Sequence, residues 1–179
     1  MPFQSAGASA TGRGHLEAGT GCEDAYRIVH RPHGVVACVC DGAGSAARSA
    51  EGAATLADNV CRTLADGITS IHSPELVTSL INAIQDTRKQ LEADGSLSEH
   101  HATLCGIAMT RDQCLVFHLG DGVIFGIDPE NWSDYVVSEP ENGEFAETTY
   151  FFTLPGWQTH LRVFAAPQRY RTWFLMTDG

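Results

Sequence analysis

Apolar residues along this chain fall into short runs of the kind that form β-strands, interrupted by two longer stretches with helical spacing. Runs bounded by turn residues predict strands at 25–31 and 34–40, and the segment 3–10 is expected to pair beside them as a further strand. After the helical stretches, strands are expected at 102–110, 114–119, 122–128, 133–138, 148–153, 160–165 and 172–177. The pattern therefore predicts a mostly β chain with one helical insertion.

The two helices are expected next to each other in the sequence. From Ser45 to about Ala65, apolar residues recur at helical spacing and form one stripe that would face a core. The second helix has start and stop signals, because Ser73 can cap it, Pro74 suits its first position and Gly95 ends it. Two sequential helices in a mostly β chain predict an antiparallel α+β domain rather than alternating β-α-β units.

The strands at 35–40 and 173–177 are apolar on both faces, so each must be covered on two sides. Two stacked sheets with helices outside them would provide this cover. We therefore expect an antiparallel β-sandwich flanked by helices, with four layers in the order α-β-β-α. With 179 residues, of which 43% are hydrophobic, the chain is expected to form a single domain over 1–179.

Three of the predicted strands end in the same dipeptide, Asp-Gly. The pairs are Asp41-Gly42, Asp121-Gly122 and Asp178-Gly179. Side-chain alternation makes each of these carboxylates continue an apolar face of its strand. A carboxylate beside a core needs a counter-charge, and the chain has only 11 Lys and Arg against 22 Asp and Glu. The pattern indicates hard oxygen ligands for divalent cations, although Asp-Gly is also a common turn pair and a plain turn remains open for each.

Charge and cysteine usage narrow the classes of partner. A formal net charge of -11 argues against nucleic acid or an anionic membrane as a partner. No run approaches the roughly 18 apolar residues that span a bilayer, and the N-terminus lacks the features of a signal peptide. The six cysteines form no Cys-x-x-Cys pair, which argues against zinc and favours free thiols in a cytoplasmic protein.

Five short motifs occur in an order that is typical of one enzyme family. They are Glu23-Asp24 after the lead Gly12-Arg13-Gly14-His15, then Cys40-Asp41-Gly42, Ala102-Thr103, Gly120-Asp121-Gly122 and Thr177-Asp178-Gly179. With them, the chain resembles the metal-dependent serine/threonine phosphatases of the protein phosphatase 2C type. Residues 147–153 are similar to a Glu-x-x-Tyr-Phe-x-Thr-like segment of the bacterial branch. The resemblance implies a β-sandwich flanked by helices, in agreement with the layers predicted above.

The resemblance also implies a chemistry. Two Mn²⁺ or Mg²⁺ ions, with a third in some members, would activate a water that attacks phosphoserine or phosphothreonine in a protein targeted by a Ser/Thr kinase. Asp41 looks like the catalytic carboxylate that bridges both ions, and Glu23 and Asp24 would hold metal-bound waters. The implied metal-site residues are Asp41, Gly42, Asp178, Asp24, Glu23 and Asp121, the last matching the position of the additional ion.

The phosphate-binding position departs from the family pattern. Many members place an Arg before the Glu-Asp pair, whereas this chain has His15 there and Arg13 two residues earlier. We expect His15, as a catalytic residue, and Arg13 to bind the phosphate, with an exposed turn histidine as the alternative for His15. Ala43 replaces a His that eukaryotic members carry as a candidate general acid. His118, inside a strand pattern, is expected to be a hydrogen-bonded packing residue.

Two other classes of function stay open. Family members continue beyond the third Asp-Gly to another metal-binding Asp, so we expect a C-terminally truncated form that lacks the last elements. The alternative to an enzyme is then a phosphatase-like module that binds a phosphorylated partner through a weakened metal site. A nucleotide or methyl-donor loop at 40–45 is a third possibility, although it lacks the Gly-x-Gly-x-x-Gly spacing.

Overall fold

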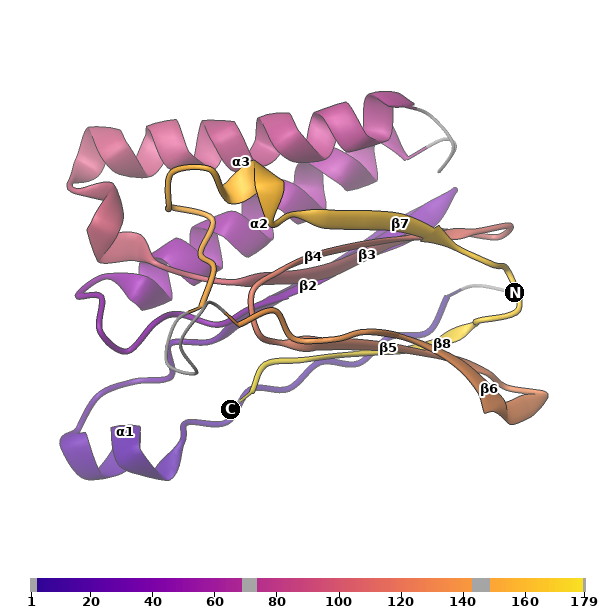
Figure 1. The fold of residues 1–179 in the computed structure, drawn as a ribbon, viewed down its shortest axis with the longest axis horizontal. Coiled ribbons are helices and arrows are strands. Elements are labelled where there is room, and N and C mark those ends of the chain that lie inside the picture. Colours follow the sequence, from indigo (N-terminus) through magenta and orange to yellow (C-terminus); the bar gives the residue numbers. More distant parts are fainter. Residues whose placement is uncertain (1–2, 69–73, 143–148, 179) are drawn as a thin grey trace.

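A computed structural model describes residues 3–68, 74–142 and 149–178 and shows two stacked antiparallel sheets with two long helices above one of them (Figure 1). The five-stranded sheet has the order β1-β2-β3-β4-β7 and the three-stranded sheet the order β6-β5-β8. The strands of the larger sheet are β1 (Ala25–Arg31), β2 (Gly34–Cys40), β3 (Leu104–Thr110), β4 (Cys114–Leu119) and β7 (Arg162–Ala166). Those of the smaller sheet are β5 (Val123–Asp128), β6 (Asn131–Ser138) and β8 (Thr172–Met176).

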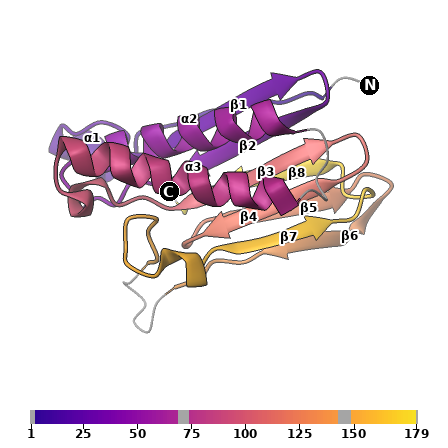
Figure 2. The ribbon, with the colours of Figure 1, turned by 90° about the horizontal axis from the view of Figure 1, so that it is seen from above.

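All the helices except α1, which precedes β1, belong to the connections between strands. They are α1 (Arg13–Ala18), α2 (Ser49–Gly67) and α3 (Pro74–Asp94), with the short 3-10 helices η1 (Leu97–His100) and η2 (Trp157–Thr159). Seen from above, α2 and α3 lie side by side across the five-stranded sheet (Figure 2). The neighbouring strands in both sheets are antiparallel, so the described residues contain no β-α-β unit of the kind that a nucleotide loop would need.

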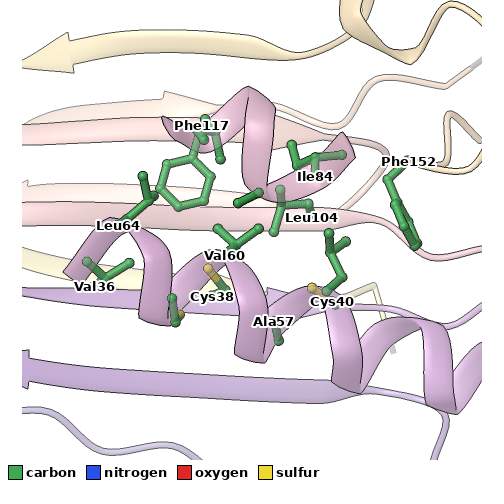
Figure 3. Close-up of a cluster of buried hydrophobic side chains, with 14 of the residues drawn as sticks. Val36, Cys38, Cys40, Ala57, Val60, Leu64, Ile84, Leu104, Phe117 and Phe152 are labelled. Carbon is green, nitrogen blue, oxygen red and sulfur yellow. The ribbon is translucent and has the colours of Figure 1, made fainter. Parts of the chain in front are cut away.

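One hydrophobic core lies between α2, α3 and the five-stranded sheet. Figure 3 shows Leu64 and Val60 of α2 packing toward Phe117 of β4 and Val36 of β2, with Ile84 of α3 on the same side. The apolar stripe predicted for the first helix is thus confirmed, since its members face this core. Burial of such side chains stabilises the fold by about 1.5–3 kcal/mol each relative to exposure.

A second, smaller core lies between the two sheets. Alternate residues of the same central strands supply it, for example Ile107 of β3 and Val116 of β4, which meet Ile124 of β5. The central strands of the larger sheet are therefore covered on both faces, as their continuous apolar runs predict. The antiparallel sandwich with helices outside is confirmed.

The outer face of the three-stranded sheet, unlike that of the five-stranded sheet, is not covered by a described helix. The described residues give three layers, α-β-β, because both long helices pack on the larger sheet and no described helix covers this face. Phe174 and Met176 of β8 point outward there and are each 47% exposed. The sequence predicted that β8 is covered on both faces. Within the described part of the chain, only its inner face is covered.

Three predicted elements need correction. Residues 3–10 form no strand, since the segment touches β1 through side chains such as Ser5 Oγ to His30 Nε2 at 2.8 Å instead of a backbone ladder. The first helix begins at Ser49 rather than Ser45, because the Arg48 N–H donates to Glu99 O at 2.8 Å and holds the chain out of a helix. In 148–153, the described residues form turns and one isolated bridge from Thr149 to Asn142.

The remaining expected elements agree with the structure to within a few residues. The second helix begins at Pro74 and ends at Asp94, directly before the predicted stop at Gly95, while its predicted cap, Ser73, lies outside the described residues. Strands β2 and β4 both run antiparallel to β3, so their last residues lie at the same end of the sheet. This topology brings the residues that follow Cys40 and Leu119 to one end of the sandwich.

Candidate functional site

Three acidic residues lie near one another at the end of the sandwich where β2 and β8 stop. Asp41 directly follows β2, Asp178 follows β8 after one intervening residue, and Asp24 directly precedes β1. The carboxyl group of Asp41 lies close enough to those of Asp178 and Asp24 for both to raise its pKa. The Thr177 hydroxyl donates to Asp24 Oδ2 at 3.3 Å and so connects β8 with the start of β1. The fold thus assembles acids that are 17 and 137 residues from Asp41 in the sequence.

The electrostatics of this cluster are those of crowded acids. The pKa of Asp41 is raised to about 8, first because burial removes water from the charged form, then because Asp178 and Asp24 stand beside it as hydrogen-bond partners and negative charges. The crowding of Asp41 by two further carboxylates is an arrangement that a divalent cation would relieve, because it supplies the opposite charge to several oxygens at once.

Gly42 is buried where backbone segments approach each other closely. A Cβ at this position would lie 2.6 Å from the carbonyl oxygen of Glu23 and 2.9 Å from the carbonyl carbon of Ser49. Only glycine therefore lets the loop after β2 pass between the segment before β1 and the start of α2. The backbone of Asp41 is fixed as well, since its N–H donates to Thr103 Oγ1 at 3.1 Å and its carbonyl accepts from Thr103 N–H at 2.9 Å.

Glu23 adds a polar atom without a partner to this end of the sandwich. Its Oε2 is buried and makes no hydrogen bond to any described residue. A Cβ at Gly44 would lie 3.7 Å from this oxygen, which places the carboxylate beside the loop that follows Asp41. A buried carboxylate oxygen without a donor is costly, so a cation or an ordered water is expected to satisfy it.

Asp121 is held from a different direction. Gly120, with φ at 106°, turns the chain out of β4, so Asp121 does not continue the strand face that holds Leu119. Its carboxylate accepts a hydrogen bond from the hydroxyl of Thr149. Both Asp121 and Asp41 raise the pKa of the Cys105 thiol by their charge, after the larger effect of its burial, so both acids lie near this residue.

The two residues expected to bind phosphate lie on the short helix α1. His15 Nδ1 contacts Thr20 Oγ1 at 2.9 Å, and Arg13 pairs with Glu17 at 2.8 Å while its side chain is 91% exposed. Among the described residues, neither side chain has a recorded contact with the three carboxylates. Their role in phosphate binding stays a prediction, as do the metal-binding roles of the acids.

The oxygen atoms at this end of the sandwich are of the kind that binds hard divalent cations, but the described side chains do not surround a common point. No three His, Cys, Asp or Glu side chains of the described residues converge closely enough to hold a metal ion as they stand. The chemistry of the donors nevertheless suits Mg²⁺ or Mn²⁺, because carboxylates and the Gly42 carbonyl are hard oxygen ligands. The orphaned Glu23 oxygen and the crowded Asp41 are the two observations that favour a cation here.

Three threonines at this end of the sandwich were not assigned a role from the sequence. Thr177 binds Asp24, Thr103 fixes the Asp41 backbone, and Thr149 binds Asp121. Both Thr103 and Thr177 stand inside the quoted motifs. Thr177 directly precedes Asp178, and Thr103 directly precedes β3, the strand next to β2, which ends directly before Asp41. Thr149 stands inside the quoted segment 147–153, which assigned it no role. These hydroxyls orient the acids.

A polar network lies behind the site between the two sheets. His118 is fully buried, and its Nδ1 lies 2.9 Å from Arg162 Nη2 and 2.8 Å from Ser138 Oγ. Because a guanidinium can only donate, Nδ1 accepts and the ring proton lies on Nε2, an atom without a partner among the described residues. Burial, followed by the charge of Arg162, lowers the pKa of His118 to about 4. The expected packing histidine is confirmed as a neutral one.

Neutral His118 predicts a pH-dependent stability. Its folded pKa of about 4 lies below the value of about 6.5 in an unfolded chain, so below pH 6.5 the unfolded state binds a proton that the folded state refuses. Stability from this group is complete above pH 6.5 and is lost as the pH falls toward 4, by about 2 kcal/mol between pH 7 and pH 5. Urea unfolding of the wild type and His118→Asn at both pH values measures this, and equal pH dependence in the two proteins would contradict it.

Comparison with known proteins identifies the family. A family profile described as Protein phosphatase 2C matches residues 11–179. The two-sheet fold with strand-end acids and this match together define the class as a protein phosphatase. The chain belongs to the protein phosphatase 2C family. A comparison with curated protein sequences gives no match.

Solved structures of bacterial phosphatases share the fold. The serine/threonine phosphatase Stp1 from Staphylococcus aureus aligns with a TM-score of 0.65 at 15% identity, over 88% of this chain and 68% of that one. A bacterial serine phosphatase aligns with a TM-score of 0.64 at 15% identity, over 82% and 68% of the two chains. RsbX in complex with magnesium aligns with a TM-score of 0.58 at 15% identity, over 89% and 67%. At this identity, the likeness shows the fold alone.

None of the described helices combines the length and the apolar character needed to cross a bilayer.

Proposed function

We propose that this protein phosphatase hydrolyses phosphoserine and phosphothreonine in proteins at a centre of two Mn²⁺ or Mg²⁺ ions. The observation that carries the proposal is the proximity of Asp41 to Asp24 and Asp178, three acids from separate segments at one end of the sandwich, which raises the pKa of Asp41. Crowding of like charges costs free energy in the fold, and a divalent cation is the partner that makes such a cluster favourable. The family supports the same chemistry.

In this proposal, each residue of the cluster has its own task. Asp41, the Gly42 carbonyl and Asp178 would hold the pair of ions, with Asp41 shared between them. Asp24, Glu23 and their neighbouring oxygens would orient waters, and Asp121 would serve a further ion. When bound, the ions supply a water of lowered pKa and neutralise the charge that develops on phosphorus.

The remaining parts of the chain position these groups. Thr103 holds the backbone of Asp41 through two hydrogen bonds, and Thr177 holds the carboxylate of Asp24. We propose that His15 and Arg13, both on α1, bind the phosphate. The substrate would be a protein phosphorylated by a Ser/Thr kinase, and six free thiols support a cytoplasmic location.

One observation favours a second candidate function. The described acids do not converge as a ready metal site, which is what a phosphatase-like module that binds a phosphorylated partner with a weakened metal site would show. Such a module would retain a phosphoprotein without converting it. The turnover experiment below separates the two.

The proposal predicts metal-dependent turnover. The protein should hydrolyse p-nitrophenyl phosphate and a phosphothreonine peptide in Mn²⁺ or Mg²⁺, and EDTA should abolish both activities because the oxygen ligands alone cannot activate water. Adding Mn²⁺ in excess over EDTA should restore them. Turnover that persists in EDTA would contradict the metal centre, and binding of the phosphopeptide without turnover by the folded protein would favour the second candidate.

A further inference from the structure

A groove runs along one side of the sandwich, between the edge strand of each sheet. β7 is the last strand of the five-stranded sheet and β6 an edge of the three-stranded sheet, and they lie on the same side of the molecule in both views (Figures 1 and 2). The groove has a volume of about 490 Å³. Its lining consists of three consecutive residues from each edge, Val137, Ser138 and Glu139 with Arg162, Val163 and Phe164.

The walls of the groove suit an extended polypeptide. An edge strand presents a row of backbone N–H and C=O groups that can pair with another strand, and within the described part of the chain β7 pairs only with β4. Peptide recognition by strand addition uses such an edge for affinity and the adjoining side chains for specificity. Val163 and Phe164 are partly buried, so they offer apolar contact beside the edge.

Arg162 is the polar group that the fold fixes at this groove. Its Nη2 donates to buried His118, and its Nε lies 3.5 Å from Glu141 Oε2 without forming a hydrogen bond. The Arg162 side chain is nevertheless 35% exposed. A guanidinium held on two sides loses little freedom on binding, so it is preorganised to donate to carbonyl oxygens of a segment lying in the groove.

The groove leads to the acidic end of the sandwich. Arg162 pairs in register with His118 of β4. Asp121 follows His118 by three residues, so the Cα atoms of His118 and Asp121 lie within about 11 Å of each other. At the same end, the Glu141 N–H donates to Gly120 O at 2.9 Å. A segment lying along β7 would therefore reach the strand ends that carry Asp121 and Asp41 within a few residues.

We propose that the groove between β6 and β7 binds an extended segment of the phosphoprotein substrate as a strand added to the edge of β7, with Arg162 donating to its carbonyl groups. This inference rests on the proposed function, because it assigns the polypeptide that flanks the phosphorylated residue to this surface. It separates binding of the protein chain from chemistry on the phosphate.

The test compares a phosphoprotein with a substrate that has no polypeptide. Arg162→Gln removes the donor, Phe164→Ala removes an apolar wall of the groove, and Arg171→Gln is the matched control on the connection to β8 at the far end of β5. For phosphorylated β-casein, the first two variants should lower kcat/KM at least tenfold through KM, while p-nitrophenyl phosphate hydrolysis stays within twofold of the wild type. Arg171→Gln should leave both substrates unchanged.

The other outcomes separate the groove from the chemistry on the phosphate. Unchanged casein kinetics in the first two folded variants would exclude the groove, and an equal loss for both substrates would place their effect at the acids instead. If the wild type hydrolyses neither substrate, the proposed function fails, and biolayer interferometry with phosphorylated β-casein decides the groove by the same comparison of variants. Light scattering that shows a dimer dissociated by Phe164→Ala would make a second copy of the chain the occupant.

Discussion

Asp41→Asn should lower kcat/KM for phosphopeptide hydrolysis at least a thousandfold in saturating Mn²⁺. The substitution keeps the shape of the side chain and removes the charge that both ions would share, so it weakens the centre as a whole. The measurement is initial-rate hydrolysis of p-nitrophenyl phosphate and a phosphothreonine peptide. Asp58→Asn is the control, because Asp58 lies on α2 and pairs only with the surface residues Arg27 and Arg62 among its recorded ion pairs.

The loss should not come from unfolding. Asp41 stands against two other acids, so removing its charge relieves repulsion in the metal-free protein. We therefore expect the melting temperature of Asp41→Asn in EDTA to be no lower than that of the wild type. A variant that stays folded and keeps more than a tenth of the activity would contradict the role of Asp41.

Phe117→Ala should have the largest effect on stability, about 3–5 kcal/mol of the free energy of unfolding. Phe117 is fully buried between β4 and the helices, and its ring lies over Gly106, the residue opposite it on β3. Because Gly106 has no side chain that could fill the space, the truncation leaves a cavity as well as losing apolar burial. Urea unfolding followed by circular dichroism measures the loss.

Phe174→Ala is the matched control for this prediction. The same chemical change is made on β8, where the ring is 47% exposed on the outer face of the three-stranded sheet. Since less apolar area returns to water, we expect a loss of about 1 kcal/mol or less. Equal losses at the two positions would show that another part of the chain covers the outer face in solution.

The larger sheet and its helices were predictable because their patterns are local and redundant. Strand β4 is apolar on both faces, and its predicted bounds agree with the structure. A strand that is buried on both faces forms a continuous apolar run, so its two ends are clear in the sequence. The start of α3 was marked by Pro74. Residues 3–10 were misread because a short run containing Gly7 lacks the branched side chains that distinguish a strand from an extended coil.

The candidate site was predictable only in part, because a site is made of contacts between distant segments. Side-chain alternation was expected to keep all three strand-end acids on buried faces. It holds for Asp41, whose face lies between the sheets, but Gly120 turns Asp121 away from its strand, and the face of Asp178 is the exposed outer one. Asp24 entered through the family motif alone, and the pairing of β4 with β7 that brings Arg162 to His118 has no local signal.

The most direct test of the central claim is to count the Mn²⁺ ions that bind. Electron paramagnetic resonance titration of metal-free protein measures free Mn²⁺, so it gives the stoichiometry and affinity without requiring turnover. The account predicts saturable binding of two ions per wild-type chain and the loss of at least one of them in Asp41→Asn, with Asp58→Asn unchanged. Wild-type protein that is folded and binds no Mn²⁺ saturably, or binds it equally well in Asp41→Asn, would contradict the account.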